Sequence, residues 1–178
     1  MSDPATLLMN VPVRRSLDGL CIRPLVLSGI FFGVLIPASL SLIGPVASFA
    51  GVMRAEISPV FLFIIIPGLF IAAGSVAIFF SPPERQYSSI AMRSCATGIL
   101  TGIVAIAVFS FTTGLFQYHP FLAPGSVARL VFAFGMLVFY FIQPLIYVFI
   151  LIFSMFSVVG GVIASRIRKR TETHIDSQ

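Results

Sequence analysis

The chain has 178 residues, of which 58% are hydrophobic and only 10% carry a charge, whereas an ordinary soluble domain has roughly 45–50% and about 25%. So few charged side chains cannot cover the surface of a soluble domain of this length, and the composition therefore predicts an integral membrane protein. The formal net charge of +5 does not indicate nucleic-acid binding, because the basic residues stand in short clusters at the ends of apolar runs.

Four uncharged runs follow one another along the chain, and each is longer than the roughly 20 residues that a membrane-spanning helix needs. They predict an all-α, four-helix transmembrane bundle made of two antiparallel hairpins. A cytoplasmic N-terminal segment at 1–23 precedes the single transmembrane domain at 24–165, and a basic cytoplasmic tail follows at 166–178. The four spans are expected at residues 25–50, 59–80, 90–116 and 127–165.

The ends of the first two runs carry recognisable signals. The first run is predicted to be an uncleaved span rather than a signal peptide, because the run and the polar segment before it both exceed signal-peptide lengths. The second run begins at Ser58 and Pro59, a helix cap followed by a first-turn proline. Proline residues after Ser81 end it.

Spans three and four are separated by a polar loop at 117–126, which lies within the third uncharged run. Within the fourth run, the only interruption is the pair Gln143 and Pro144. Proline kinks a membrane helix without ending it, because neighbouring groups can satisfy the carbonyl that it leaves free. We therefore expect one long, bent fourth helix. A fifth span would place the basic tail outside.

The orientation follows from the distribution of Lys and Arg, which favour the cytoplasmic side of a membrane. Nine of these residues lie in the N-terminal segment, the connection at 81–93 and the tail. Only Arg54 and Arg129 lie on the other side. The distribution predicts a multi-pass protein with both termini in the cytoplasm.

Small residues recur on every span at intervals of three and four, which places them on one face of each helix. Lipid gives helices no hydrophobic reason to associate, so close approach through small residues must hold them together. This face is expected to pack within one bundle, and dimerisation through it is the alternative. The predicted helix-packing residues are Gly29, Gly33, Gly68, Ala72, Gly98, Gly102 and Gly161.

A catalytic or metal site is not expected. All six acidic residues lie in termini or connections, His119 is in an external loop, and His174 is in the tail. An enzyme would need a nucleophile with a base, a carboxylate pair or metal ligands brought together. Cys21 and Cys95 have no spacing typical of a disulfide framework or a zinc site. We expect no catalytic residue, no metal and no cofactor.

Gln143 is the one strongly polar side chain in the middle of a span. Its amide is expected to bind the backbone carbonyl that Pro144 leaves free, which is a structural role. The alternative is a small channel or carrier whose pathway passes Gln143 and Pro144 and forms on oligomerisation. Proton coupling is not expected, because no acidic, basic or histidine side chain lies in the middle of a span.

Three low-specificity segments mark the layout: Pro83-Glu84-Arg85 in the central connection, Gly98-x-x-x-Gly102, and Gly160-Gly161 before the basic tail. This layout resembles small four-span prokaryotic integral membrane proteins of unknown function, and the resemblance implies a cell-membrane location and no particular activity. We therefore expect a non-enzymatic accessory protein, scaffold or oligomeric subunit. Its partners would be the lipid bilayer and either a second copy or a larger membrane complex.

Overall fold

The computed structural model describes residues 11–41, 61–82, 86–116 and 127–175, and these parts of the chain are helical with short turns. Two prolines, Pro24 and Pro37, lie inside the first helix without ending it, as membrane helices tolerate. The elements in chain order are α2 (Val11–Ser41), the π-helical η1 (Phe61–Ile65), α5 (Ile66–Phe79), α6 (Tyr87–Phe116), α7 (Val127–Ile142) and α8 (Pro144–Ile175).

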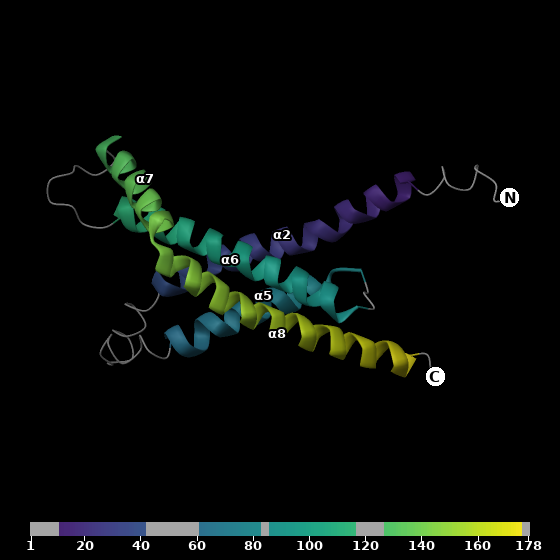
Figure 1. Cartoon of the computed structure of the whole chain (residues 1–178). Coiled ribbons are helices and arrows are strands. Elements are labelled where there is room, and N and C mark those ends of the chain that lie inside the picture. Colours follow the sequence, from purple (N-terminus) through teal and green to yellow (C-terminus); the bar gives the residue numbers. More distant parts are fainter. Residues whose placement is uncertain (1–10, 42–60, 83–85, 117–126, 176–178) are drawn as a thin grey trace.

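α2, α5, α6 and α8 lie side by side, and α7 projects from them (Figure 1). α8 packs against α5 and α6, while α2 packs against α6 and α5. α7 packs against the end of α6 and scarcely touches α8. The start of α2, the end of α8 and the facing ends of α5 and α6 lie at one end of the bundle, which we call the basic end (Figure 1).

Three helical segments of the described chain are long and apolar enough to cross a membrane. Because lipid is the natural solvent for such segments, the chain is a membrane protein. Two further apolar segments are shorter, namely Phe63–Phe79 and Val127–Ile142. The three long segments are Ile22–Ser41, Tyr87–Leu115 and Pro144–Thr171.

The fourth predicted helix is two helices, so the prediction of one bent helix over 127–165 is wrong. α7 ends at Ile142 and α8 begins at Pro144, with Gln143 between them. Pro144 has no backbone N–H, so it cannot continue the helical hydrogen bonds of α7. At the same point the packing partner changes, because α7 packs mainly against α6 whereas α8 packs against α5 and α6. α8 also continues to Ile175, so the predicted tail is largely helical.

The most deeply buried side chains are small or carry a hydroxyl group, a few large apolar side chains such as Phe70 and Ile90 are buried with them, and many others face outward. Among described residues, the largest side chains that are fully buried are all serines and threonines. Leu27, Phe31 and Phe63 are instead more than 60% exposed. This is the arrangement that lipid favours, since it rewards close helix contact and tolerates apolar exposure. The fully buried hydroxyl residues are Ser94, Thr97, Thr101, Ser110, Ser154 and Ser157.

Candidate functional site

The contact between α6 and α8 is made by small residues. A Cβ placed on Gly98 would lie 2.7 Å from Ser154 Cα and 2.8 Å from Ser157 Cβ, so only glycine allows this approach. The Ser157 hydroxyl donates a hydrogen bond of 2.7 Å to the Ser94 carbonyl. One turn further on, a Cβ at Gly161 would collide with the Ser94 hydroxyl. The two backbones therefore meet directly over two turns.

α5 meets the same stripe of α8 from the other side. A Cβ on Gly74 would collide with the Ser157 carbonyl oxygen, and one on Gly160 would collide with the Ile71 carbonyl oxygen. The Ser75 hydroxyl lies 2.9 Å from the Ile71 carbonyl and 3.0 Å from the Gly160 carbonyl, so it can donate to either. α8 therefore packs closely between α5 and α6, because glycines on both sides of each contact allow the backbones to approach.

α2 is attached in the same way. A Cβ at Gly33 would lie 2.6 Å from Val104 Cβ on α6, and one at Gly29 would lie 2.8 Å from the Leu100 side chain. On the other side of α2, the buried Ser28 hydroxyl donates a bond of 2.7 Å to the Ala73 carbonyl of α5. Every described helix that packs in the bundle therefore carries at least one small residue at its contact.

The structure places most of the predicted packing residues at helix contacts, with one clear exception on α5. A Cβ on Gly102 would lie 3.1 Å from the Ile150 side chain, and Ala72 is half-buried. Gly68 is exposed, and no atom of the described chain lies within 4 Å of a Cβ built on it. The described residues therefore show no packing contact at Gly68, and the buried face of α5 runs instead through Phe70, Ala73, Gly74 and Ala77.

Two glycines at the tightest contacts, Gly74 and Gly160, were not among the predicted packing residues. α5 has small residues on several sides, so spacing alone does not select the face that packs. On α8, Gly160 and Gly161 are adjacent, and each faces a different neighbour: α5 for the first and α6 for the second. The adjacent glycines of α8 therefore allow two neighbouring helices to approach it closely at the same level.

At the break around Gln143, backbone N–H groups and the Tyr147 hydroxyl donate hydrogen bonds to the nearby carbonyls. The Gln143 backbone N–H donates to the Tyr140 carbonyl at 3.2 Å, and the Ile146 N–H donates to the Gln143 carbonyl at 3.2 Å. The Tyr147 hydroxyl donates to the Phe141 carbonyl at 2.6 Å. The expected role of the Gln143 side chain is thus filled by its own N–H and by Tyr147, a residue that no sequence pattern indicated.

Basic side chains fasten the basic end of the bundle. Arg168 donates from a guanidinium nitrogen to the Ser81 carbonyl at 2.6 Å, which caps the end of α5. The Lys169 ammonium lies 4.6 Å from the centre of the Tyr87 ring at the start of α6, a cation–π contact. At the opposite end, Arg129 of α7 approaches the Leu115 carbonyl of α6 at 3.5 Å.

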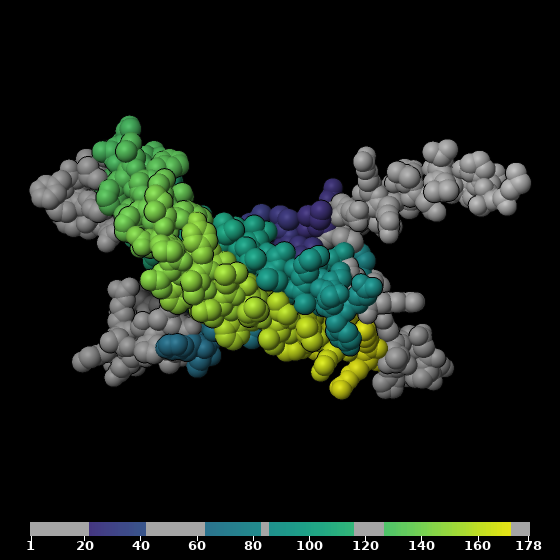
Figure 2. Space-filling view, viewed as in Figure 1, coloured from purple at the N-terminus to yellow at the C-terminus, as the bar shows by residue number. Residues whose placement is uncertain are grey.

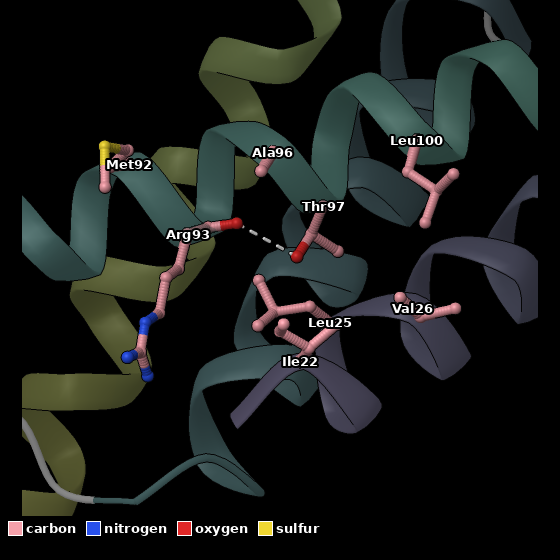
Figure 3. A pocket seen from close by; sticks show the side chains of 8 residues that line it. All are labelled: Ile22, Leu25, Val26, Met92, Arg93, Ala96, Thr97 and Leu100. Atoms are coloured by element: carbon pink, nitrogen blue, oxygen red, sulfur yellow. Dashed lines mark hydrogen bonds between the residues drawn. The ribbon is translucent and has the colours of Figure 1, made fainter. Parts of the chain in front are cut away.

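Three apolar grooves of the described chain open on the outside of the bundle. The largest of them, about 590 Å³, lies between α2 and α5, and one of about 250 Å³ lies between α5 and α8. A groove of about 430 Å³ lies between α2 and α6. Figure 3 shows Ile22 and Leu25 of α2 pointing toward Thr97 of α6, while the guanidinium of Arg93 points away from Leu100. Thr97 donates to the Arg93 carbonyl at 3.1 Å.

The described residues contain no group of three or more His, Cys, Asp or Glu side chains that could hold a metal ion. His119, Glu84 and Arg85 lie outside the described residues, so the predictions about them stay predictions. The helix contacts, the break at Gln143 and the apolar grooves are therefore the features of the described chain that bear on its function. The chain matches no protein-family model, and no curated protein or solved structure is significantly similar to it.

Proposed function

We propose that this chain is a four-span membrane protein with both termini in the cytoplasm, acting without catalysis as a scaffold, accessory protein or oligomeric subunit. α2, η1 with α5, α6 and α8 would be the four spans. Six basic residues with described side chains, near the cytoplasmic ends proposed for α2, α6 and α8, support this orientation, because Lys and Arg favour the cytoplasmic side. They are Arg23, Arg93, Arg166, Arg168, Lys169 and Arg170.

The observation that carries the proposal is that three interior hydroxyl groups form hydrogen bonds across helix contacts. Ser28, Ser75 and Ser157 each donate to a backbone carbonyl of a neighbouring helix. Several other buried hydroxyls donate to carbonyls of their own helix, as Thr101 does to Thr97 at 2.8 Å. Such groups stabilise a membrane bundle and leave its outward apolar surface as the part that meets other molecules.

α7 is the element best placed to meet a protein partner. Its buried residue, Ala133, packs on Gly114 of α6, where an added Cβ would lie 2.5 Å from Ala133 Cα. Leu130, Val131 and Phe134 are 46–66% exposed. Figure 2 shows α7 rising from the bundle as a separate ridge. A second copy or another membrane protein could pack against this face as one membrane helix packs against another.

The test is the assembly state in a native-like membrane. The full chain, purified in nanodiscs or mild detergent, is expected to run as a homo-oligomer or to co-purify with a defined membrane protein. Crosslinks from a cysteine placed at exposed Val131 should form in the assembly, whereas crosslinks from a cysteine at exposed Leu27 of α2 should not. A chain that stays monomeric and partnerless in native membranes contradicts the proposal.

The orientation is tested separately with reporters. Fusions after Gln178 and at Gln86 are expected to read cytoplasmic, and an insertion at Ala123 is expected to read external. A swapped sign at any of the three positions overturns the four-span arrangement. The assembly experiment does not depend on this result.

One observation favours the alternative of a small channel or carrier. The helix break places the half-buried Gln143 and the exposed Pro144 at a point of irregular backbone, and transporters place such backbone at substrate pathways. This alternative requires a closed oligomer with a water-lined pore. Solute or ion flux in vesicles that is abolished by Gln143→Leu, with assembly unchanged, would establish it over the scaffold role.

A further inference from the structure

We infer that the groove between α2 and α5 binds one anionic phospholipid, with an acyl chain along its apolar walls and the headgroup phosphate at Arg23. The inference requires only that the chain lies in a membrane and is independent of the scaffold role. The groove has a volume of about 590 Å³ and is the largest of the three described. Its walls are formed mainly by Leu27, Phe31, Phe32, Val76 and Phe80.

The composition of the groove selects a lipid rather than a water-soluble ligand. Leu27, Phe31 and Phe80 are 62–69% exposed, so the groove opens sideways along the outer surface of two helices that lie in the membrane. The only buried polar side chain on its walls, Ser28, already donates its hydroxyl to the Ala73 carbonyl. The walls therefore offer an apolar ligand contact area and little hydrogen bonding.

The one cation among the described residues that line the groove stands where a headgroup would lie. Arg23 is the last charged residue before the uncharged run that begins at Pro24, and its side chain is exposed. At this depth an arginine reaches toward the lipid headgroups and binds phosphate with its planar, forked donors. The remaining cations of the basic end raise the local concentration of anionic lipid, so Arg23 meets a ligand of opposite charge.

The neighbouring grooves lack this combination. In the groove between α2 and α6 the guanidinium of Arg93 points away from the apolar side chains (Figure 3), and Arg93 has an interaction within the chain. The groove between α5 and α8 is lined by apolar residues and Ser75, with no basic residue. Only the α2–α5 groove, among those described, joins a long apolar wall to an outward-reaching arginine.

The experiment titrates the purified, delipidated full chain with phosphatidylglycerol or phosphatidylcholine of identical acyl chains and counts bound lipids by native mass spectrometry. The first phosphatidylglycerol is expected to bind roughly five-fold more tightly than phosphatidylcholine, the factor that one basic side chain near an anionic surface contributes. Arg23→Gln should bring the two affinities together. Arg166→Gln, which removes an exposed charge from the same end but from α8, should leave the preference intact.

A second pair of variants tests the apolar part. Leu27→Trp should reduce the binding of both lipids several-fold by filling the groove, while Leu151→Trp on the exposed face of α8 should not. If Leu27→Trp does not fold, as judged by circular dichroism and elution volume, Phe31→Ala removes part of the wall instead and should weaken both lipids. Equal effects of Arg23→Gln and Arg166→Gln, or unchanged binding after the groove substitutions, overturn the inference.

Discussion

The same glycine-to-alanine substitution at two positions of α5 should distinguish the packed face of this helix from its exposed face by its effect on stability. Gly74 and Gly68 lie in the same helix, and Gly→Ala is the same chemical change at both. At Gly74 the new Cβ would collide with the Ser157 carbonyl oxygen and lie 2.7 Å from the Ser157 carbonyl carbon, against 3.4–4 Å in ordinary contact. At Gly68 it meets no described atom within 4 Å.

The expected magnitudes follow from these contacts. Relief of the clash at Gly74 requires α5 and α8 to move apart, and inserting a methyl group into a packed contact costs about 1–3 kcal/mol. The same movement lengthens the 3.0 Å bond from Ser75 to the Gly160 carbonyl, which adds about 0.6 kcal/mol. Alanine recovers about 0.5–1 kcal/mol of helix propensity. Gly74→Ala should therefore lower stability by about 0.6–3 kcal/mol, and Gly68→Ala should leave it equal or slightly higher.

The assay is reversible unfolding from mild detergent into sodium dodecyl sulfate, followed by far-ultraviolet circular dichroism. The two variants should differ in midpoint, with wild type close to Gly68→Ala. Matching midpoints for the two variants would show that α5 does not pack on α8 through Gly74. Loss of stability at Gly68 alone would mean that the face predicted from spacing is the packed one.

Two further hydroxyl contacts have measurable consequences. Ser157→Ala removes the hydrogen bond to the Ser94 carbonyl and should lower the free energy of unfolding by about 0.6–1.7 kcal/mol in the same assay. Ser110→Ala should cost less, because the Ser110 hydroxyl bonds only within its own helix. An equal loss at both positions would show that the α6–α8 bond has no special role. Tyr147→Phe removes the donor to the Phe141 carbonyl and should increase deuterium exchange around residues 140–147 while leaving α5 unchanged, and unaltered exchange there would argue that the bond does not stabilise the break.

The class of fold could be predicted from the sequence, because apolar run length and composition depend on the solvent rather than on neighbouring helices. The small-residue face of α6 could also be predicted, since Gly98 and Gly102 lie one turn apart on the same side of the helix, whereas on α8 Gly161 was predicted and the adjacent Gly160 was not. The packed face of α5 could not be predicted from the spacing of its small residues. Its small residues surround the helix, and the partner that decides which side is buried, the stripe around Ser157 of α8, is far away in the chain.

The break between α7 and α8 shows a different limit of sequence reasoning. Whether a proline kinks or ends a membrane helix depends on what satisfies the surrounding carbonyls. Here the hydroxyl of Tyr147 supplies the donor to Phe141, and α7 finds a separate contact at Gly114. Both depend on tertiary structure, so the presence of Gln143 and Pro144 alone could not decide between one helix and two.

The two ends of the bundle differ in the contacts that hold their helices together, and this difference bears on where the proposed partner would bind. At the basic end, Arg168 and Lys169 tie α8 to α5 and α6, beside the interior where backbones meet at Gly74 and Gly98. At the far end, α7 is separated from α8 by a broken turn and packs mainly on α6. Local opening is easiest where buried contacts are fewest. Because α7 also carries an exposed apolar face, it is the helix on which the proposed partner would pack while the rest of the bundle keeps its packing.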